Sequence, residues 1–463
     1  MAEIHLSTPG LAGADAPAAP ARPSLAYAWY SLGVLVVVTL FAFIDRQVII
    51  LLAEQIKVAF KLSDLQLGFL QGTAVALFSA VAAYPLAWAA DRIDRRLVLS
   101  VCIAVWSLAV VGCGLAQSYT QILIATAMVA AAEAGLAPMT FAIIPELFPP
   151  EKRQLANSVF ALVSVATGSI ALALGGAMIA GVGALQPSLP PDLAGLEVWR
   201  LSFFAVALPA PFMIALLFTA RLGGRGKMAH GAVEAAEPQQ EEPVGSLVSF
   251  LFDRGAAMLR LYGALGIANF GYQALLAWVV VIGLRAFSQT EAEVGAAIGL
   301  AALAATPVGF VSSLALTRLF ARRVGPSFPV RLLTIGYLIS GPILGLLWLA
   351  PSAEVFYAII FVGYAINITM GMILPTAIQS LAPPALRARA ISVNFVVNVL
   401  LSSIAAPLVG FLSDSFGSDP RVILTSALMV TVPSLIVAGL VLLTAQKAFG
   451  EALADAKARG EAA

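Results

Sequence analysis

Apolar segments of about 20 residues recur along the whole chain, and short polar stretches separate them. A helix needs about 20 apolar residues to cross the hydrocarbon core of a bilayer. The strands of a membrane β-barrel would instead show short alternating runs, which this chain lacks. The pattern therefore predicts an all-α membrane protein with twelve spanning helices, at 28–56, 65–90, 96–116, 120–147, 153–181, 200–221, 256–285, 292–317, 327–350, 354–381, 388–414 and 420–446.

The longest polar stretch lies between the sixth and seventh predicted helices and divides the chain into two halves. The first residues are rich in Ala and Pro and lack the basic region and short apolar core of a signal peptide. The predicted parts are a disordered tail at 1–25, a six-helix bundle at 26–221, a linker at 222–253, a second six-helix bundle at 254–448 and a tail at 449–463.

The basic residues of the loops predict the orientation, because loops on the cytoplasmic side of a membrane carry an excess of Lys and Arg. The loops on the side of the N-terminus are rich in Arg, whereas the opposite loops hold only Lys57, Lys61, Arg200, Arg285 and Arg421. We therefore expect a multi-pass protein of the inner (plasma) membrane with both termini and the linker in the cytoplasm.

The two halves repeat each other in sequence. SDLQLG (63–68) matches TEAEVG (290–295) at an offset of 227, and both begin with a capping box, in which Ser or Thr precedes Gln or Glu by three residues. PPEKRQLANS (149–158) matches PPALRARAIS (383–392) at an offset of 234, which also superposes Gly176 on Gly410. A parallel repeat of six helices is typical of transporters whose halves rock around a site at mid-membrane depth.

Only three ionisable residues lie well inside the predicted helices: Asp45, Arg46 and Glu133. An uncompensated charge at the centre of a membrane helix costs about 2.5–3.5 kcal/mol, and such residues are functional candidates. A purely structural ion pair is the alternative, although buried pairs stabilise a fold only weakly. The pattern favours a functional charge cluster.

The fourth helix carries a polar stripe, since Thr126, Glu133 and Thr140 recur every seven residues. Such a stripe is expected of a helix that lines a wet cavity or packs closely on a neighbour. In the empty cavity Arg46 would pair with the carboxylates. An anionic substrate would attract its bidentate donors, and a carboxylate would then take up a proton. Asp45 and Glu133 are the predicted protonation sites.

The second half has no intramembrane charge of this kind and offers polar side chains at Asn269, Tyr272, Gln273, Asn367, Asn394 and Asn398. Charge in one half, with amides and apolar surface in the other, suits an amphiphile with an anionic or zwitterionic head. Asymmetry between halves is common, so this inference also allows small organic anions. Together with Arg46, Thr126 and Thr140, these six residues form the predicted substrate-binding set.

The composition argues against several other functions. The chain is 60% hydrophobic and 11% charged, with a net charge of +1, so it offers no basic patch for nucleic acid. Neither His lies in a predicted helix, and no intramembrane Lys could form a Ser–Lys dyad, which argues against an enzyme. Cys102 and Cys113 lack the neighbours of a metal site, so we expect no metal and no cofactor. A receptor or scaffold would not explain the repeat.

The loop AADRIDRR (89–96) resembles the cytoplasmic loop between helices two and three of major facilitator superfamily transporters, although Ala87 and Asp94 replace its two glycines. In that family the loop helps to hold the cytoplasmic gate, with its Asp near the start of the eleventh helix. The resemblance implies two bundles around a central cavity and a monomer. The implied gate residues are Asp91, Arg92, Arg95 and Arg96, with Glu146 and Arg153 from a second loop.

Two longer stretches, IDRQVIILLAEQIKVAFKLSDLQLGFLQG and AAEAGLAPMTFAIIPELFPPEKRQLANS, resemble the spinster branch. That branch moves lysolipids and sphingosine phosphate, and its bacterial members are thought to be proton-linked. The resemblance implies protons and an amphiphilic lipid as partners, besides the membrane lipids. Thr126 stands where the branch often has Arg, and Ala132 where it has Gly. The alternative is a proton-linked symporter of small organic anions such as aromatic or sugar acids, which should need a second cationic anchor.

Overall fold

The structure is a computed structural model that describes residues 24–220, 222, 255–324, 327–382, 386–417 and 419–458. Within these ranges the chain is helical, without strands, and twelve helical stretches are long and apolar enough to cross a membrane. This confirms the predicted all-α fold and the number of spanning helices. Most of the predicted N-terminal tail and linker lies outside the described residues. The last helix runs to Ala458, past the predicted end of the second bundle.

The first half contains helices that often combine in pairs to make one spanning stretch. Its elements are α1 (Leu25–Leu51), α2 (Ala53–Phe60), α3 (Asp64–Gly68), the π-helical turn η1 (Phe69–Thr73), α4 (Ala74–Arg92), α5 (Arg95–Leu115), α6 (Tyr119–Glu133), α7 (Leu136–Leu147), α8 (Pro150–Leu185), the 3₁₀ turn η2 (Gln186–Ser188), α9 (Pro191–Ala194), α10 (Val198–Ala207) and α11 (Ala210–Thr219).

The second half is built in the same way from longer helices. Its elements are α14 (Gly255–Leu276), α15 (Val279–Ala286), α16 (Glu291–Val324), α17 (Phe328–Gly345), the 3₁₀ turn η4 (Leu346–Leu349), α18 (Ala353–Leu381), α19 (Arg387–Phe416) and α20 (Val422–Ala458).

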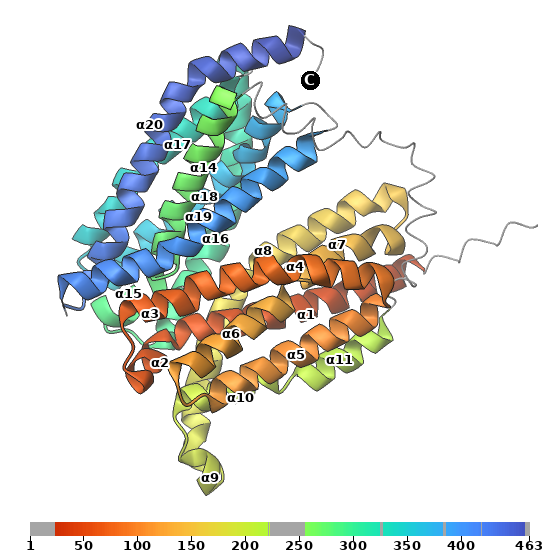
Figure 1. The fold of residues 1–463 in the computed structure, drawn as a ribbon, viewed down its shortest axis with the longest axis vertical. Coiled ribbons are helices and arrows are strands. Elements are labelled where there is room, and N and C mark those ends of the chain that lie inside the picture. Colours follow the sequence, from red (N-terminus) through yellow and green to blue (C-terminus); the bar gives the residue numbers. More distant parts are fainter. Residues whose placement is uncertain are drawn as a thin grey trace, which may run out of the picture.

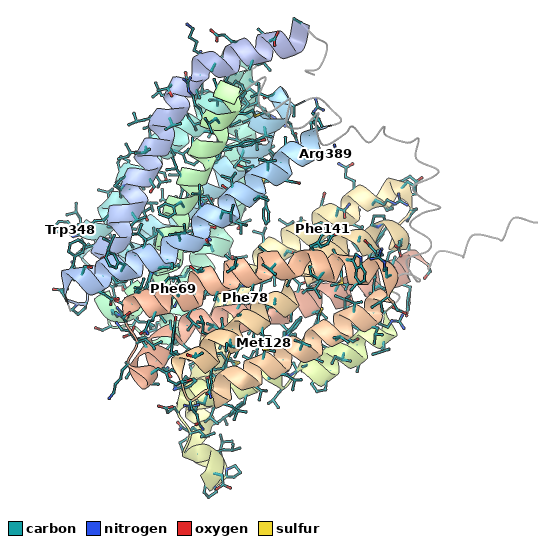
Figure 2. All side chains as sticks on the ribbon, viewed as in Figure 1. Phe69, Phe78, Met128, Phe141, Trp348 and Arg389 are labelled. Carbon is teal, nitrogen blue, oxygen red and sulfur yellow. The ribbon has the colours of Figure 1, made fainter. Side chains whose placement is uncertain are left out.

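Large apolar side chains are exposed along both halves, among them Phe78, Met128, Phe141 and Trp348 (Figure 2). So large an exposed apolar surface is unfavourable in water, but it suits contact with the hydrocarbon core of a bilayer. The two halves meet near α3, α15 and α16 and diverge toward the opposite end (Figure 1). At that opposite end α1 begins and α11 ends, and the Tyr27 hydroxyl donates to the Thr219 carbonyl.

Hydrogen bonds confirm the predicted repeat. In both capping boxes the hydroxyl accepts a backbone N–H, from Gln66 to Ser63 at 3.2 Å and from Glu293 to Thr290 at 3.3 Å. At the offset of 234, Arg153 Nε donates to the Phe148 carbonyl at 3.2 Å, and Arg387 Nε donates to the Ala382 carbonyl at 3.3 Å. The halves therefore share side-chain contacts as well as topology.

Two crossings related by the repeat join the halves, α3 and η1 against α19, and α16 against α8. Each crossing depends on a Gly-x-x-x-Gly pair, Gly68 with Gly72 and Gly295 with Gly299. A Cβ on Gly68 would lie 2.6 Å from the Ala406 carbonyl oxygen, and a Cβ on Gly295 would lie 2.7 Å from that of Leu172. Residues 172 and 406 also differ by 234. Glycine is required here because the backbones are in direct contact.

At each crossing, a third glycine packs against the first residue of a helix from the other half. A Cβ on Gly410 would overlap the Asp64 carbonyl oxygen, and a Cβ on Gly176 would lie 2.7 Å from the Glu291 carbonyl oxygen. The sequence offset had already paired these two glycines, and the structure supplies the reason. Each receives the first residue of a capped helix from the other half, which closes this end of the molecule.

We predict that Gly410→Ala weakens this closure, because the added methyl meets a backbone carbonyl that cannot move independently. Overpacking of this kind costs about 1–3 kcal/mol, which would shift the ratio of open to closed molecules at least about fivefold. Spin labels on cysteines introduced at the exposed residues Val58 and Ser415 would report a longer distance, and both native cysteines are buried.

The matched control is Gly33→Ala, because a Cβ at Gly33 meets nothing within 4 Å. It should leave the distance between the labels unchanged. An unchanged distance in Gly410→Ala as well would show that this glycine contact does not hold the closed end.

Candidate substrate cavity and charge cluster

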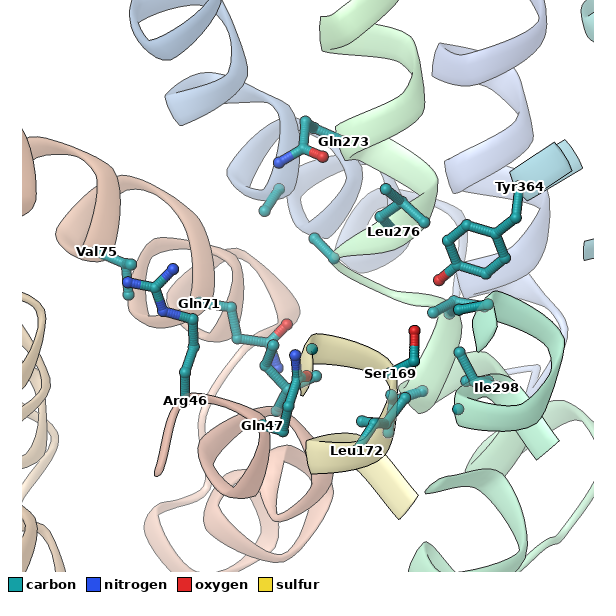
Figure 3. Close-up of a pocket in the computed structure, with 18 of the residues that line it drawn as sticks. Arg46, Gln47, Gln71, Val75, Ser169, Leu172, Gln273, Leu276, Ile298 and Tyr364 are labelled. Carbon is teal, nitrogen blue, oxygen red and sulfur yellow. The ribbon is translucent and has the colours of Figure 1, made fainter. Parts of the chain in front are cut away.

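A cavity of about 490 Å³ lies between the halves, next to the two glycine crossings. Pockets for small amphiphilic ligands have volumes of about 300–1,000 Å³. Most of the lining is apolar, and its polar members are Arg46, Gln47, Gln71, Ser169, Gln273, Thr306, Tyr364 and Ser402. Figure 3 shows Arg46, Gln47 and Gln71 on the wall formed by the first half, with Gln273 and Tyr364 on the facing wall.

Of the predicted substrate-binding residues, Arg46 and Gln273 line this cavity. They occupy equivalent positions of the repeat, since 273 and 46 differ by 227. The cationic side chain of the first half and the amide of the second therefore enter the cavity at matching places.

The other predicted ligands lie outside the lining of this cavity. Thr140 is buried and donates to the Leu136 carbonyl at 2.9 Å, and Thr126 lies 3.9 Å from the Cys113 sulfur. The stripe therefore bonds within its own bundle. The remaining predicted ligands outside the lining are Asn269, Tyr272, Asn367, Asn394 and Asn398.

Two of these side chains bond inside the second bundle, Tyr272 with the Ser340 hydroxyl and Asn269 with the Asn398 carbonyl at 3.4 Å. Sequence reasoning missed the polar lining residues Gln47, Gln71, Ser169, Thr306, Tyr364 and Ser402. Gln71 could have been found, because it lies between the glycines of a Gly-x-x-x-Gly motif that marks a close helix crossing.

The three intramembrane charges form one cluster beside the cavity. Arg46 Nη2 lies 3.4 Å from Glu133 Oε2, and the two side chains are 42% and 5% exposed, respectively. Asp45 is buried against Trp106 and near Glu133. Arg46 thus pairs with Glu133, one of the two carboxyls that it was predicted to meet, while no ion pair joins it to Asp45 among the described residues.

The cluster contains two carboxyls and one guanidinium. Asp45 Oδ1 and Glu133 Oε1 are buried and have no hydrogen-bond partner among the described residues. A buried charge is tolerated only when it is paired and hydrogen-bonded. The cluster thus holds one more acidic than basic side chain, and neither of these two oxygens is satisfied within it.

Among the described residues, the contacts of the predicted gate residues lie within the first half. Arg95 pairs with Glu146 at 2.6 Å, and Arg96 Nη2 donates to the Ala220 carbonyl at 2.6 Å. Arg92 stacks over Trp88 with 4.0 Å to the ring centroid, and Arg153 caps its own loop as described above. Asp91 is exposed and has no partner in the described part of the chain. Its predicted contact with the eleventh helix is not made, because the halves diverge at this end (Figure 1).

The opposite end is closed by charged groups, of which the sequence had indicated Arg285 as a loop charge and had not indicated the acidic partners. Arg285 Nη1 and Nη2 bond both oxygens of Asp64 at 2.9 and 2.8 Å, and Arg285 Nε bonds Glu54 at 2.7 Å. The Asp414 carboxylate accepts the N–H groups of Asp64 and Leu65 at 2.8 and 2.9 Å. These contacts add charge-assisted bonds between the halves to the glycine crossings.

Comparison with known proteins assigns this architecture to a family. The family description "Major Facilitator Superfamily" matches residues 35–406. The chain belongs to this superfamily. A curated relative is an MFS-type efflux pump of Mycolicibacterium smegmatis (strain ATCC 700084 / mc(2)155), 27% identical over 395 residues that cover 85% of this chain and 86% of the pump. Protein spinster homolog 3 of Danio rerio is 27% identical over 193 residues, 40% of this chain and 39% of that protein.

Solved transporters of the superfamily share the fold. The crystal structure of a bacterial homolog of the human lysosomal transporter Spinster, inward-facing and occupied, gives a TM-score of 0.73 at 23% identity, over 92% of this chain and 97% of that one. A D-xylose–proton symporter gives 0.63 at 14% identity, over 90% and 97%. The predicted resemblance to the superfamily and to spinster proteins is thus confirmed.

We predict that Asp414→Asn also favours separation of the closed end. The amide keeps an acceptor oxygen but loses the negative charge that the N-terminus of the helix beginning at Asp64 stabilises. Asp414 is exposed, and such a charge contributes about 0.3–1 kcal/mol at an exposed site, so the ratio of open to closed molecules should rise about two- to fivefold. The same spin-label pair measures this ratio.

Asp419→Asn is the control for this substitution, because Asp419 is also exposed, but among the described groups its carboxylate accepts only the Arg421 N–H of its own loop. Equal effects of the two substitutions would argue against a specific role of Asp414.

Proposed function

We propose that this transporter moves amphiphilic lipids with an anionic head, such as a lysophospholipid or a sphingosine-phosphate-like molecule, by proton-coupled alternating access. One observation carries the proposal: a single guanidinium enters a largely apolar cavity and is paired at its other side with a buried carboxylate. The head would bind Arg46, and the acyl chain would lie along the apolar lining.

Coupling follows from competition for Arg46. A phosphate or carboxylate head offers the guanidinium a bidentate partner, and binding would draw Arg46 from Glu133. The carboxylate left in an apolar environment then favours the protonated form. Asp45 is the second protonation site, because it lies close to Glu133 without a cation of its own. The halves would then close over the substrate and its proton.

The orientation is part of the same proposal. With the Arg-rich loops in the cytoplasm of a cell bounded by its plasma (inner) membrane, the diverging ends of the halves face the cytoplasm and the Asp64–Arg285 end faces outward. Both termini are then cytoplasmic, and the transporter works as a monomer. The family supports transport rather than catalysis, and the solved spinster homolog shares the fold. The lipid class rests on the largely apolar cavity and on the resemblance of two sequence stretches to the spinster branch.

Proton-linked transport of small organic anions is the alternative. The D-xylose–proton symporter has a similar fold, so the fold does not decide between them. The cavity lining favours the amphiphile, because Arg46 is the single cationic side chain among its described residues. A small polyanion or acid would lack the second cation that anchors it.

We predict that lysophospholipid added to lightly buffered proteoliposomes produces a pH change that Asp45→Asn and Glu133→Gln each reduce at least tenfold. The reason is that neither variant can exchange the proton at that position. Arg46→Gln should lower the apparent affinity for the lipid to a similar degree, because an anionic head then lacks its bidentate partner.

Benzoate and gluconate test the alternative in the same liposomes. A pH change with these acids and none with lysophospholipid would overturn the lipid assignment and keep the proton mechanism. A wild-type pH change that both carboxyl variants retain would overturn the coupling sites.

A further inference from the structure

The π-helical turn η1 lies within the first glycine crossing and on the cavity wall. It comprises Phe69–Thr73, between Gly68 and the start of α4. The repeat-equivalent stretch, 296–300, is regular α-helix within α16. Because a π turn holds one more residue than an α turn, it rotates the side chains that precede it relative to those that follow, and such turns are common at functional sites.

The turn contributes Gln71 to the cavity lining (Figure 3). Both polar atoms of its amide, Nε2 and Oε1, are shielded from solvent and have no hydrogen-bond partner among the described residues. Leaving a buried donor and acceptor unpaired destabilises a fold unless a ligand or water pairs with them. The equivalent position of the second half is Ile298, which also lines the cavity, so the scaffold itself does not need an amide here.

Packing across the crossing is provided by the residues that follow Gln71. A Cβ on Gly72 would lie 2.8 Å from the Ala406 Cβ, and the Thr73 hydroxyl donates to the Ser403 carbonyl at 2.6 Å. These contacts account for the closeness of the turn to α19. The Gln71 amide has no such partner, so it can turn into the cavity by a change of rotamer without breaking a bond.

We propose that Gln71 is a headgroup ligand that reads a hydrogen-bond donor next to the anionic group held by Arg46. A guanidinium only donates hydrogen bonds, whereas the amide oxygen of Gln71 accepts one from a hydroxyl or amine and its NH₂ group donates to an oxygen. The pair therefore selects a phosphate-bearing amphiphile with a free hydroxyl or amine beside the phosphate. This inference rests on the proposed function and specifies its substrate.

Binding to protein in lipid nanodiscs tests the inference with three probes: lysophosphatidate, the same lipid with its glycerol hydroxyl methylated, and glycerol phosphate. Wild type should bind lysophosphatidate about tenfold more tightly than the methylated lipid. Gln71→Leu should abolish that difference and change binding of the methylated lipid less than about twofold. Gln71→Met, close in size, should do the same if the Leu variant does not fold.

Ile298→Ala is the matched control on the facing wall, since it removes apolar contact and should weaken both lipids to the same degree. Equal binding of the two lipids by wild type, or a difference that survives in Gln71→Leu and Gln71→Met, overturns the role of Gln71. If wild type binds neither lipid, both the role of Gln71 and the proposed function are overturned. If glycerol phosphate binds as tightly as lysophosphatidate and loses affinity in Gln71→Leu, the headgroup role stands and the lipid assignment fails.

Discussion

Direct backbone contact at glycine is the constraint on which this transporter depends. At each of the two crossings a Gly-x-x-x-Gly pair from one half meets carbonyl oxygens of the other, and a third glycine receives the start of a capped helix. In a bilayer, where lipid tails are as apolar as the side chains, close packing rather than the hydrophobic effect drives such association. The crossings hold one end of the molecule together and border the cavity, while the other end diverges (Figure 1).

Charged side chains bond across the two halves at the closed end, whereas at the diverging end they bond within one half. The Asp64 carboxylate bonds Arg285 and Lys57, and Asp414 receives the N–H groups at the start of the same helix. The bonds of Arg285 and Asp414 link the two halves, whereas Lys57 belongs to the same half as Asp64. At the diverging end, the arginines of the family loop bond partners within their own half. The charged contacts between the halves that the structure describes thus lie at the closed end.

The cavity derives its chemistry from differences between two equivalent scaffolds. Arg46 faces Gln273 and Gln71 faces Ile298 at matching positions of the repeat. One wall therefore presents a cation and amides, backed by two buried carboxyls, and the other presents an amide and the hydroxyls of Thr306, Tyr364 and Ser402 among apolar groups. A symmetric scaffold with asymmetric walls suits a substrate that is itself polar at one end and apolar along its length.

The sequence by itself determined the twelve helices, the repeat, both capping boxes and the three intramembrane charges, because hydropathy and capping are properties of short segments. It also predicted that Arg46 pairs with an intramembrane carboxylate, because a charge within a bilayer needs a partner of opposite charge. Only the tertiary structure decided which side of each helix faces the cavity. Thr126, Thr140 and Tyr272 bond within their own bundles, and Gln71 reaches the cavity through a π turn that no periodicity indicates. Rotation about a helix axis and contacts such as Arg285 with Asp64, 221 residues apart, depend on how the helices pack against one another.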